Sequence, residues 1–183
     1  MKIDCQNILQ WTEAQLKYTY DVGLNEASAE ELHDALGRSV MMAISDGWRN
    51  SKKVRETQRK AYYFSAEYLI GRLVFSNLFN LGILDEMKKL FAKRGVDLAI
   101  LEDIEDAALG NGGLGRLSAC FLDSAASTNI PLSGYGLRYK FGLFKQSFDG
   151  KGNQVQEADD WTKFGDPWSY RRYKHTVKIS FPD

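Results

Sequence analysis

The sequence predicts a mixed α/β fold that is helical at its start and β-rich toward its end. Three patterns indicate it: an amphipathic helix that opens near residue 28, a short aromatic run at residues 61–65, and a glycine loop at residues 110–115 that leads into another helix. The chain has 183 residues, of which 44% are hydrophobic and 26% charged. This composition is typical of a globular domain and argues against disorder.

Charge and cysteine content exclude several classes of protein. Lys plus Arg and Asp plus Glu number 24 each, so no net charge attracts nucleic acid or an anionic membrane. Two cysteines are too few for a disulfide framework, and no apolar run approaches the ~20 residues of a membrane span. We therefore expect a cytoplasmic protein. The histidines, His33 and His175, lack a paired ligand spacing, so we expect no metal site and ordinary surface or half-buried side chains.

The first part of the chain predicts two helices. One covers residues 5–22, and the next begins at the capping box Ser28–Glu31 and continues to about residue 50. The apolar residues of the second helix recur at steps of four and predict its core-facing side: Leu32, Leu36, Val40, Ile44 and Trp48. A basic cluster follows, which we interpret as a solvated helix end, with a patch for an anionic effector as the alternative: Arg49, Lys52, Lys53, Arg55, Arg59 and Lys60.

The aromatic run at residues 61–65 predicts a buried central strand. Glu67 follows at the carboxyl end of that strand, which is where ligands gather in open α/β sheets. The alternative is that Glu67 only caps the next segment. Residues 68–80 and 84–94 then predict helices, with Gly82 and Gly95 as their stop signals.

The segment Gly110–Leu117, with the sequence GNGGLGRL, is the strongest functional signal. Glycines at four of the six positions 110–115 allow sharp turns and a close approach of the backbone to a ligand. Residues 116–126 combine strong helix formers with apolar residues at helical spacing. A helix that starts here directs unpaired N–H groups and its positive dipole end toward the loop, which suits a phosphate or another anion.

Two other interpretations of the loop stay open. Gly110, Gly112 and Gly115 match the G-x-G-x-x-G dinucleotide fingerprint, which requires a strand immediately before it. Residues 101–108 are too acidic for a buried parallel strand, so a nicotinamide or flavin site is disfavoured. The glycines can also serve only to form a turn and pack a helix closely.

From Pro131 onward the sequence predicts extended structure. Glycines and aromatic residues alternate over residues 132–148, and residues 149–153 predict the turn of a hairpin. The carboxylates of residues 157–161 can act as acid and base, but helix capping and hydrogen bonding near Trp161 is the favoured interpretation. Residues 176–181 alternate as a final strand does.

Taken together, these stretches resemble one family, the α-glucan phosphorylases, which include glycogen, starch and maltodextrin phosphorylases. Five segments carry the resemblance in collinear order: residues 62–72 (YYFSAEYLIGR), 108–124 (ALGNGGLGRLSACFLDS), 134–139 (GYGLRY), 157–161 (EADDW) and 165–168 (GDPW).

The resemblance implies a fold, a reaction and a set of site residues. It implies an incomplete amino-terminal Rossmann-like domain of a glycosyltransferase B-type fold, in an enzyme that cleaves α-1,4-glucan with phosphate to give glucose 1-phosphate. It implies pyridoxal phosphate as cofactor. It further implies that the loop amides of Gly112, Gly113 and Leu114, together with Asn111, contact substrate sugar and phosphate, with Gly112 and Gly113 near the cofactor phosphate. It also implies that Glu67 supports the loop.

The resemblance also implies that these residues form only part of the enzyme. We expect a partial domain with a helical leader at 1–58, a strand, helices and the glycine loop-helix at 59–130, and a β-rich segment at 131–183. The cofactor lysine is expected in a carboxy-terminal domain outside this chain, which alone is predicted to be inactive. A homodimer is expected at full length. The alternative function is a non-catalytic carbohydrate- or nucleotide-binding module.

Overall fold

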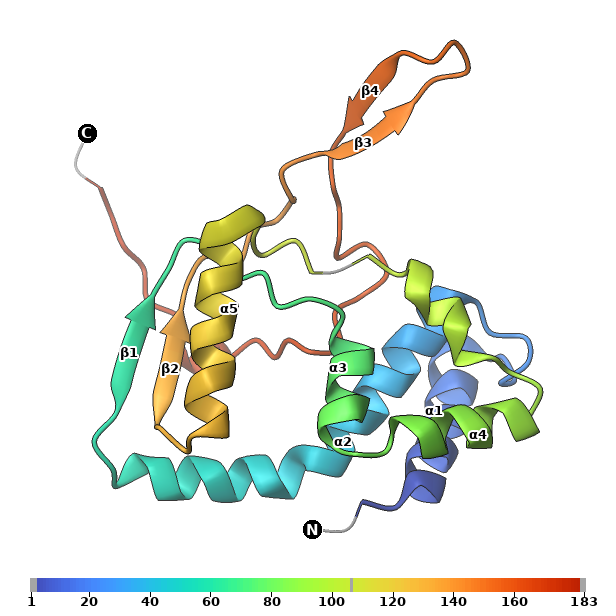
Figure 1. Cartoon of the computed structure of the whole chain (residues 1–183), viewed down its shortest axis with the longest axis horizontal. Coiled ribbons are helices and arrows are strands. Elements are labelled where there is room, and N and C mark those ends of the chain that lie inside the picture. The colour runs from blue at the N-terminus through green and yellow to red at the C-terminus, as the bar shows by residue number, and fades with distance from the viewer. Residues whose placement is uncertain (1–2, 106, 182–183) are drawn as a thin grey trace.

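The computed structural model describes residues 3–105 and 107–181 and combines a group of helices with a small α/β unit (Figure 1). The long helix α2, Ala29–Glu56, connects them: its first half packs among the other helices and its second half leads to strand β1. Mixed α/β character is therefore confirmed.

The hydrophobic core lies among the helices. Helix α1, Cys5–Tyr20, packs against α2 and against α4, Leu84–Lys93. The short helix α3, Leu73–Asn80, and the 3-10 helix η1, Leu98–Asp103, cover the remaining sides of α2. The largest fully buried apolar side chains come from all of these elements and include Ile8, Leu36, Leu78, Phe91 and Leu98.

Helix α2 begins where the sequence predicted and extends further. The Ser28 hydroxyl accepts a hydrogen bond from Glu31 N–H, and the Glu31 carboxylate accepts one from Ser28 N–H, which confirms the capping box. The helix ends at Glu56 instead of about residue 50. Its predicted core face is wrong in the second half, where Trp48 is 56% exposed, because α1 and α3 pack only against the first half.

The α/β unit consists of two parallel strands and one helix. Strand β1, Ala61–Phe64, pairs with β2, Leu132–Tyr135, in a register that sets Ala61 opposite Leu132. Helix α5, Gly112–Ser127, packs against one face of this pair (Figure 1). The strand at 61–65 is confirmed, but its predicted burial is wrong. Phe64 is 75% exposed, because successive side chains of a strand point to opposite faces and its neighbour Tyr63, which meets Phe121, takes the face toward α5.

The predicted helix at 68–80 begins late. Residues 68–72 are not helical; this segment is instead tied to the glycine loop, where Tyr68 N–H donates to Leu109 O at 2.8 Å and Leu69 N–H donates to Gly115 O at 2.9 Å. Gly71, with φ of 74°, then turns the chain into α3. The stops at Gly82 and Gly95 are confirmed by their positive φ values of 69° and 80°.

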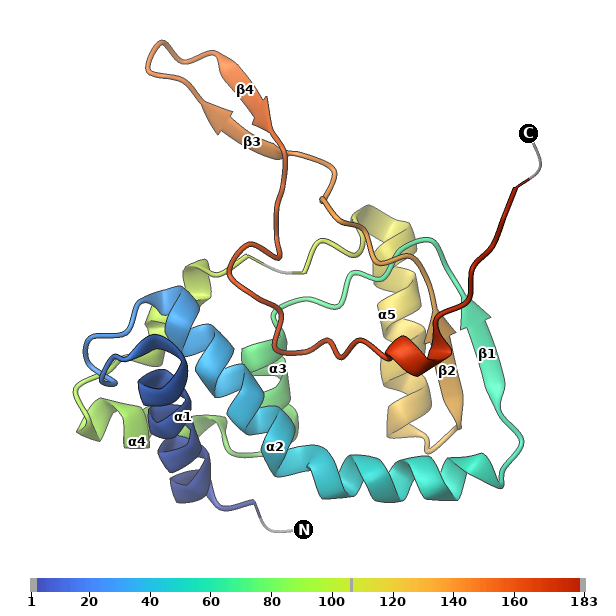
Figure 2. The ribbon, with the colours of Figure 1, turned by 180° about the vertical axis from the view of Figure 1, so that it is seen from behind.

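The last part of the chain is less β-rich than predicted. Strands β3, Lys145–Phe148, and β4, Gln154–Glu157, form the predicted hairpin, which projects away from the rest of the molecule (Figure 2). Residues 176–181 form no strand, and the single-turn 3-10 helix η2, Tyr173–His175, precedes them. Figure 2 shows this segment passing the face of β1 and β2 opposite α5, and its side chains stay exposed there.

Candidate functional site

The glycine loop leads directly into helix α5, which begins at Gly112. Asn111 is its N-cap, with extended backbone angles of φ −142° and ψ 146°, and its side chain makes no capping hydrogen bond. The first amides of a helix have no partner inside the helix. The residues that carry them here, Gly112, Gly113 and Leu114, are exposed, and exposed N–H donors at a helix start are of the kind that suits an anion.

The glycines of the loop divide into two groups. A Cβ atom at Gly110 would lie 2.8 Å from the backbone of Tyr68 and Leu69, and one at Gly115 would lie 3.1 Å from Leu69 N. These two glycines allow the loop to pack against the segment that follows β1. Gly113, in contrast, has no atom within 4 Å of a Cβ position. Close packing therefore explains why glycine is needed at positions 110 and 115. It does not explain the glycine at position 113.

Glu67 lies beside the start of the helix. Its Oε2 atom accepts a hydrogen bond from Asn111 N–H at 2.9 Å, and the side chain is half-buried. A carboxylate near a helix N-terminus also interacts favourably with the helix dipole. The Glu67 carboxylate therefore holds Asn111, the residue just before the exposed amides. This contact reaches across to the glycine loop, so Glu67 does more than cap the segment that follows it.

Tyr68 joins the loop to both strands, a role that sequence analysis did not predict. Its hydroxyl lies 2.8 Å from Tyr63 O and 3.2 Å from Tyr135 O, at the carboxyl ends of β1 and β2. Burial raises the pKa of this phenol, which stays protonated and donates. Its ring also lies against Gly136, where a Cβ atom would come within 2.7 Å of it. The close glycine spacing at 134 and 136 is the only sequence feature that reflects this contact.

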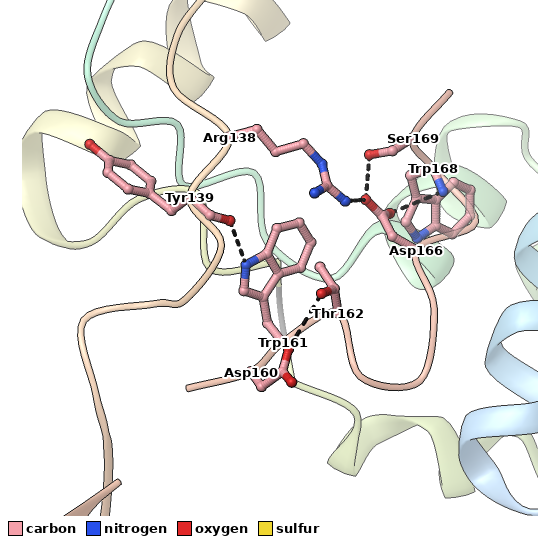
Figure 3. A network of polar contacts seen from close by, with 8 residues as sticks. All are labelled: Arg138, Tyr139, Asp160, Trp161, Thr162, Asp166, Trp168 and Ser169. Carbon is pink, nitrogen blue, oxygen red and sulfur yellow. Dashed lines mark hydrogen bonds and ion pairs between the residues drawn. The ribbon is translucent and has the colours of Figure 1, made fainter. Parts of the chain in front are cut away.

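Three of the sequence motifs meet in a network of polar contacts next to the site (Figure 3). The Arg138 guanidinium donates to Asp166 Oδ2 at 3.0 Å and lies 5.0 Å from the ring centre of Trp161. Trp161 Nε1–H donates to Tyr139 O at 3.2 Å. Because the Tyr139 hydroxyl donates to Ala66 O at 3.0 Å, the network reaches the residue next to Glu67.

The carboxylates of residues 157–161 do not cap a helix, so that prediction is wrong. Asp160 precedes a turn, in which its Oδ1 accepts from the Thr162 hydroxyl at 3.4 Å. Hydrogen bonding near Trp161 is confirmed. Within the described ranges 3–105 and 107–181, no group of three or more His, Cys, Asp or Glu side chains is arranged to hold a metal ion.

The segment before the loop does not supply the context of a dinucleotide site. Residues 98–103 form η1, and no strand enters Gly110 in the part of this segment that the structure describes. The predicted site residues Glu67, Asn111, Gly112, Gly113 and Leu114 do come together, at one end of α5. His33 is half-buried and His175 exposed, as expected. No helix of the described residues is both long and apolar enough to cross a membrane.

Comparisons with known proteins give the same family as the motifs. A family model described as "Carbohydrate phosphorylase" matches residues 91–183. A glycogen phosphorylase of Chlamydia trachomatis is 42% identical over 158 residues, which cover 85% of this chain and 19% of that protein. Glycogen phosphorylase, muscle form, of Homo sapiens is 37% identical over 169 residues, covering 91% of this chain and 20% of its own. The chain thus spans about a fifth of the length of these relatives, and it belongs to the carbohydrate phosphorylase family.

Proposed function

We propose that this chain is part of an α-1,4-glucan phosphorylase. The complete enzyme uses inorganic phosphate to cleave the terminal α-1,4 bond of a glucan, and it releases glucose 1-phosphate with retained configuration. The names of the relatives support a glycogen phosphorylase. The observation that carries the proposal is the exposed start of α5, where open amides lie beside a fixed carboxylate.

The chemistry of this helix end fits the proposed substrates. A phosphate ion and a sugar hydroxyl both offer oxygen acceptors, and the amides of Gly112, Gly113 and Leu114 are donors that need no rearrangement to receive them. The bond between Glu67 and Asn111 holds the helix start in one orientation before substrate arrives. The role we assign to this chain is therefore binding and orientation of the glucosyl unit and the anion.

Pyridoxal phosphate is the cofactor that we propose for the complete enzyme. When bound, it supplies a phosphate group that takes part in proton transfer. The donor set at the start of α5 fits a phosphate group, and the exposed Gly112 and Gly113 are the residues that we propose lie near it. We propose that the lysine that binds the cofactor covalently belongs to the part of the enzyme beyond these residues.

The architecture of the complete enzyme is part of the same proposal. The parallel strands β1 and β2 with α5 on one face are consistent with part of a Rossmann-like domain, which we propose is the amino-terminal domain of a glycosyltransferase B-type fold. We further propose that the complete enzyme is a homodimer and acts in the cytoplasm.

The test is an assay of the full-length protein that contains residues 1–183. We expect glucose 1-phosphate to form from glycogen or maltodextrin only when phosphate is present, together with the absorbance of bound pyridoxal. Glucan binding without glucose 1-phosphate would instead identify a non-catalytic carbohydrate-binding module. Either that result or the absence of both activities would refute the proposal.

A further inference from the structure

Two serine hydroxyls meet between β1 and α5. Ser65 directly follows β1, and Ser118 lies in the second turn of α5, where its side chain is fully buried. Their Oγ atoms are 2.8 Å apart although the residues are 53 positions apart in the chain. This partly buried hydrogen bond links the end of the strand to the helix.

Each of the two hydroxyls has a second hydrogen-bonding neighbour. The Ser118 hydroxyl lies within donor distance of both Ser65 Oγ, at 2.8 Å, and Leu114 O, at 3.0 Å. Ser65 Oγ keeps its lone pairs for the Glu67 N–H, which lies 3.3 Å away.

The result is a continuous chain of donors and acceptors from Glu67 to Leu114. Glu67 N–H donates to Ser65 Oγ, and the Ser118 hydroxyl contacts both Ser65 Oγ and Leu114 O. The Glu67 side chain meanwhile holds Asn111 N–H. Glu67 is thus connected to the start of α5 at two points. Its carboxylate contacts the N-cap residue Asn111, and its backbone N–H is linked to the carbonyl of Leu114 through the hydroxyls of Ser65 and Ser118.

We propose that Ser65 and Ser118 are positioning residues that set the direction of the amides at the start of α5, and so the affinity of the site for phosphate. This inference rests on the proposed phosphorylase function. Its physical basis is that hydrogen bonds weaken steeply when donor and acceptor are misaligned, so a small rotation of the first turn reduces anion binding.

The test uses alanine variants of the full-length enzyme: Ser65→Ala, Ser118→Ala and the double variant. Ser39→Ala is the matched control. Ser39 is also a buried helical serine, 1% exposed, and its hydroxyl donates to Ala35 O four residues back, but it lies in α2 within the helical core. Ser39→Ala and Ser118→Ala thus both remove the hydroxyl of a buried helical serine, and of these two only Ser118 is linked to the glycine loop, through the half-buried Ser65.

We expect the KM for phosphate to rise roughly three- to tenfold in each single variant, as loss of one ordinary hydrogen bond implies. The KM for glucan should change less, and the double variant should resemble the singles, because both residues act through one chain of bonds. Ser65→Thr, which keeps the hydroxyl, should restore the phosphate KM. Thermal melting of each variant, compared with Ser39→Ala, separates this effect from general destabilisation.

Two results would overturn the inference while leaving the proposed function intact. In the first, the wild-type enzyme is active and the Ser65 and Ser118 variants match Ser39→Ala in phosphate KM. In the second, the effects of Ser65→Ala and Ser118→Ala add fully in the double variant, which would show that they act separately. Loss of the proposed function itself would appear differently, as a wild-type enzyme that forms no glucose 1-phosphate.

Discussion

Glycines that look alike in the sequence have different roles in the loop. Gly110 has no space for a Cβ atom because the backbone of Tyr68 passes 2.8 Å from that position. Gly112 adopts a left-handed backbone with φ of 61°, which other residues rarely adopt. Gly113 has neither constraint. An absent side chain at position 113 therefore leaves room in front of the helix, where we propose that substrate binds.

Gly113→Ala tests this difference directly. We expect the full-length variant to be as stable as wild type or slightly more stable, because alanine is favoured over glycine in a helix by about 0.5–1 kcal/mol. We expect phosphorolysis to fall at least tenfold, because the new methyl group occupies the space of the ligand. The measurements are kcat/KM for phosphate and the thermal midpoint.

Gly110→Ala is the paired control for that prediction. Here the methyl group meets the backbone of Tyr68 and Leu69, so we expect a loss of stability of about 1–3 kcal/mol. Wild-type activity in Gly113→Ala, or equal destabilisation in both variants, would contradict our proposal that substrate occupies the open space beside Gly113.

Glu67 is the second residue whose role can be tested alone. Glu67→Ala removes the acceptor for Asn111 N–H, and we expect kcat/KM to fall by about 10- to 100-fold, because the helix start loses its fixed orientation. Glu67→Gln keeps an oxygen acceptor and should retain more activity than Glu67→Ala. Equal steady-state kinetics for the two variants would show that the acceptor at this position is unimportant.

At the scale of elements, the sequence predicted best what is determined by local interactions. The capping box, the helix that follows the glycine loop and the hairpin around residues 149–153 all depend on neighbours close in the chain, and all are confirmed. The predictions that proved wrong concern segments whose structure depends on contacts with residues far away in the chain. Residues 68–72 were predicted to be helical, but Tyr68 and Leu69 are held against the distant Leu109 and Gly115 by backbone hydrogen bonds.

The candidate site follows the same rule. The loop and Glu67 were predicted because glycine spacing and the end of a strand are visible in the sequence. The contacts of Ser65 with Ser118 and of Tyr139 with Ala66 join residues 53 and 73 positions apart. No local pattern contains such pairs, so only the folded chain identifies them.

The contact between α2 and residues 165–168 predicts a pH dependence of stability. The His33 ring is 6.4 Å from the Trp168 ring, and burial lowers the pKa of His33 below its ordinary value of 6.5, although Asp34 and Asp166 oppose the shift. As pH falls below 6.5 the unfolded chain binds the proton first, so the free energy of unfolding declines. His33→Gln should flatten this decline below about pH 6.5 in urea titrations. An unchanged slope would exclude His33 as its source.

In the molecule as a whole, the buried hydrophobic core lies among the helices α1–α4 and η1, whereas the α/β unit and the end of the chain leave many apolar side chains exposed. Large apolar side chains stay exposed on β1, on the hairpin and at the end of the described chain, including Phe64 at 75%, Phe148 at 78% and Phe181 at 86%. Apolar surface of this extent is typical of contact regions. It agrees with a chain that spans about a fifth of its relatives' length.

The isolated 183 residues should therefore bind phosphate and glucan weakly and should not catalyse phosphorolysis. We expect no glucose 1-phosphate from glycogen and phosphate, because α5 supplies donors to only one side of the substrates. We also expect concentration-dependent self-association in sedimentation experiments, driven by the exposed aromatic side chains. Phosphate-dependent formation of glucose 1-phosphate by this segment alone would contradict our proposal that catalysis also requires the rest of the enzyme.

The most direct test of the central claim is a crystal structure of the full-length enzyme with phosphate and a short maltooligosaccharide. We expect ligand oxygen atoms about 2.7–3.2 Å from the backbone nitrogens of Gly112, Gly113 or Leu114, with Glu67 still bonded to Asn111. Substrates bound elsewhere, with the start of α5 in contact with water or covered by protein, would contradict it.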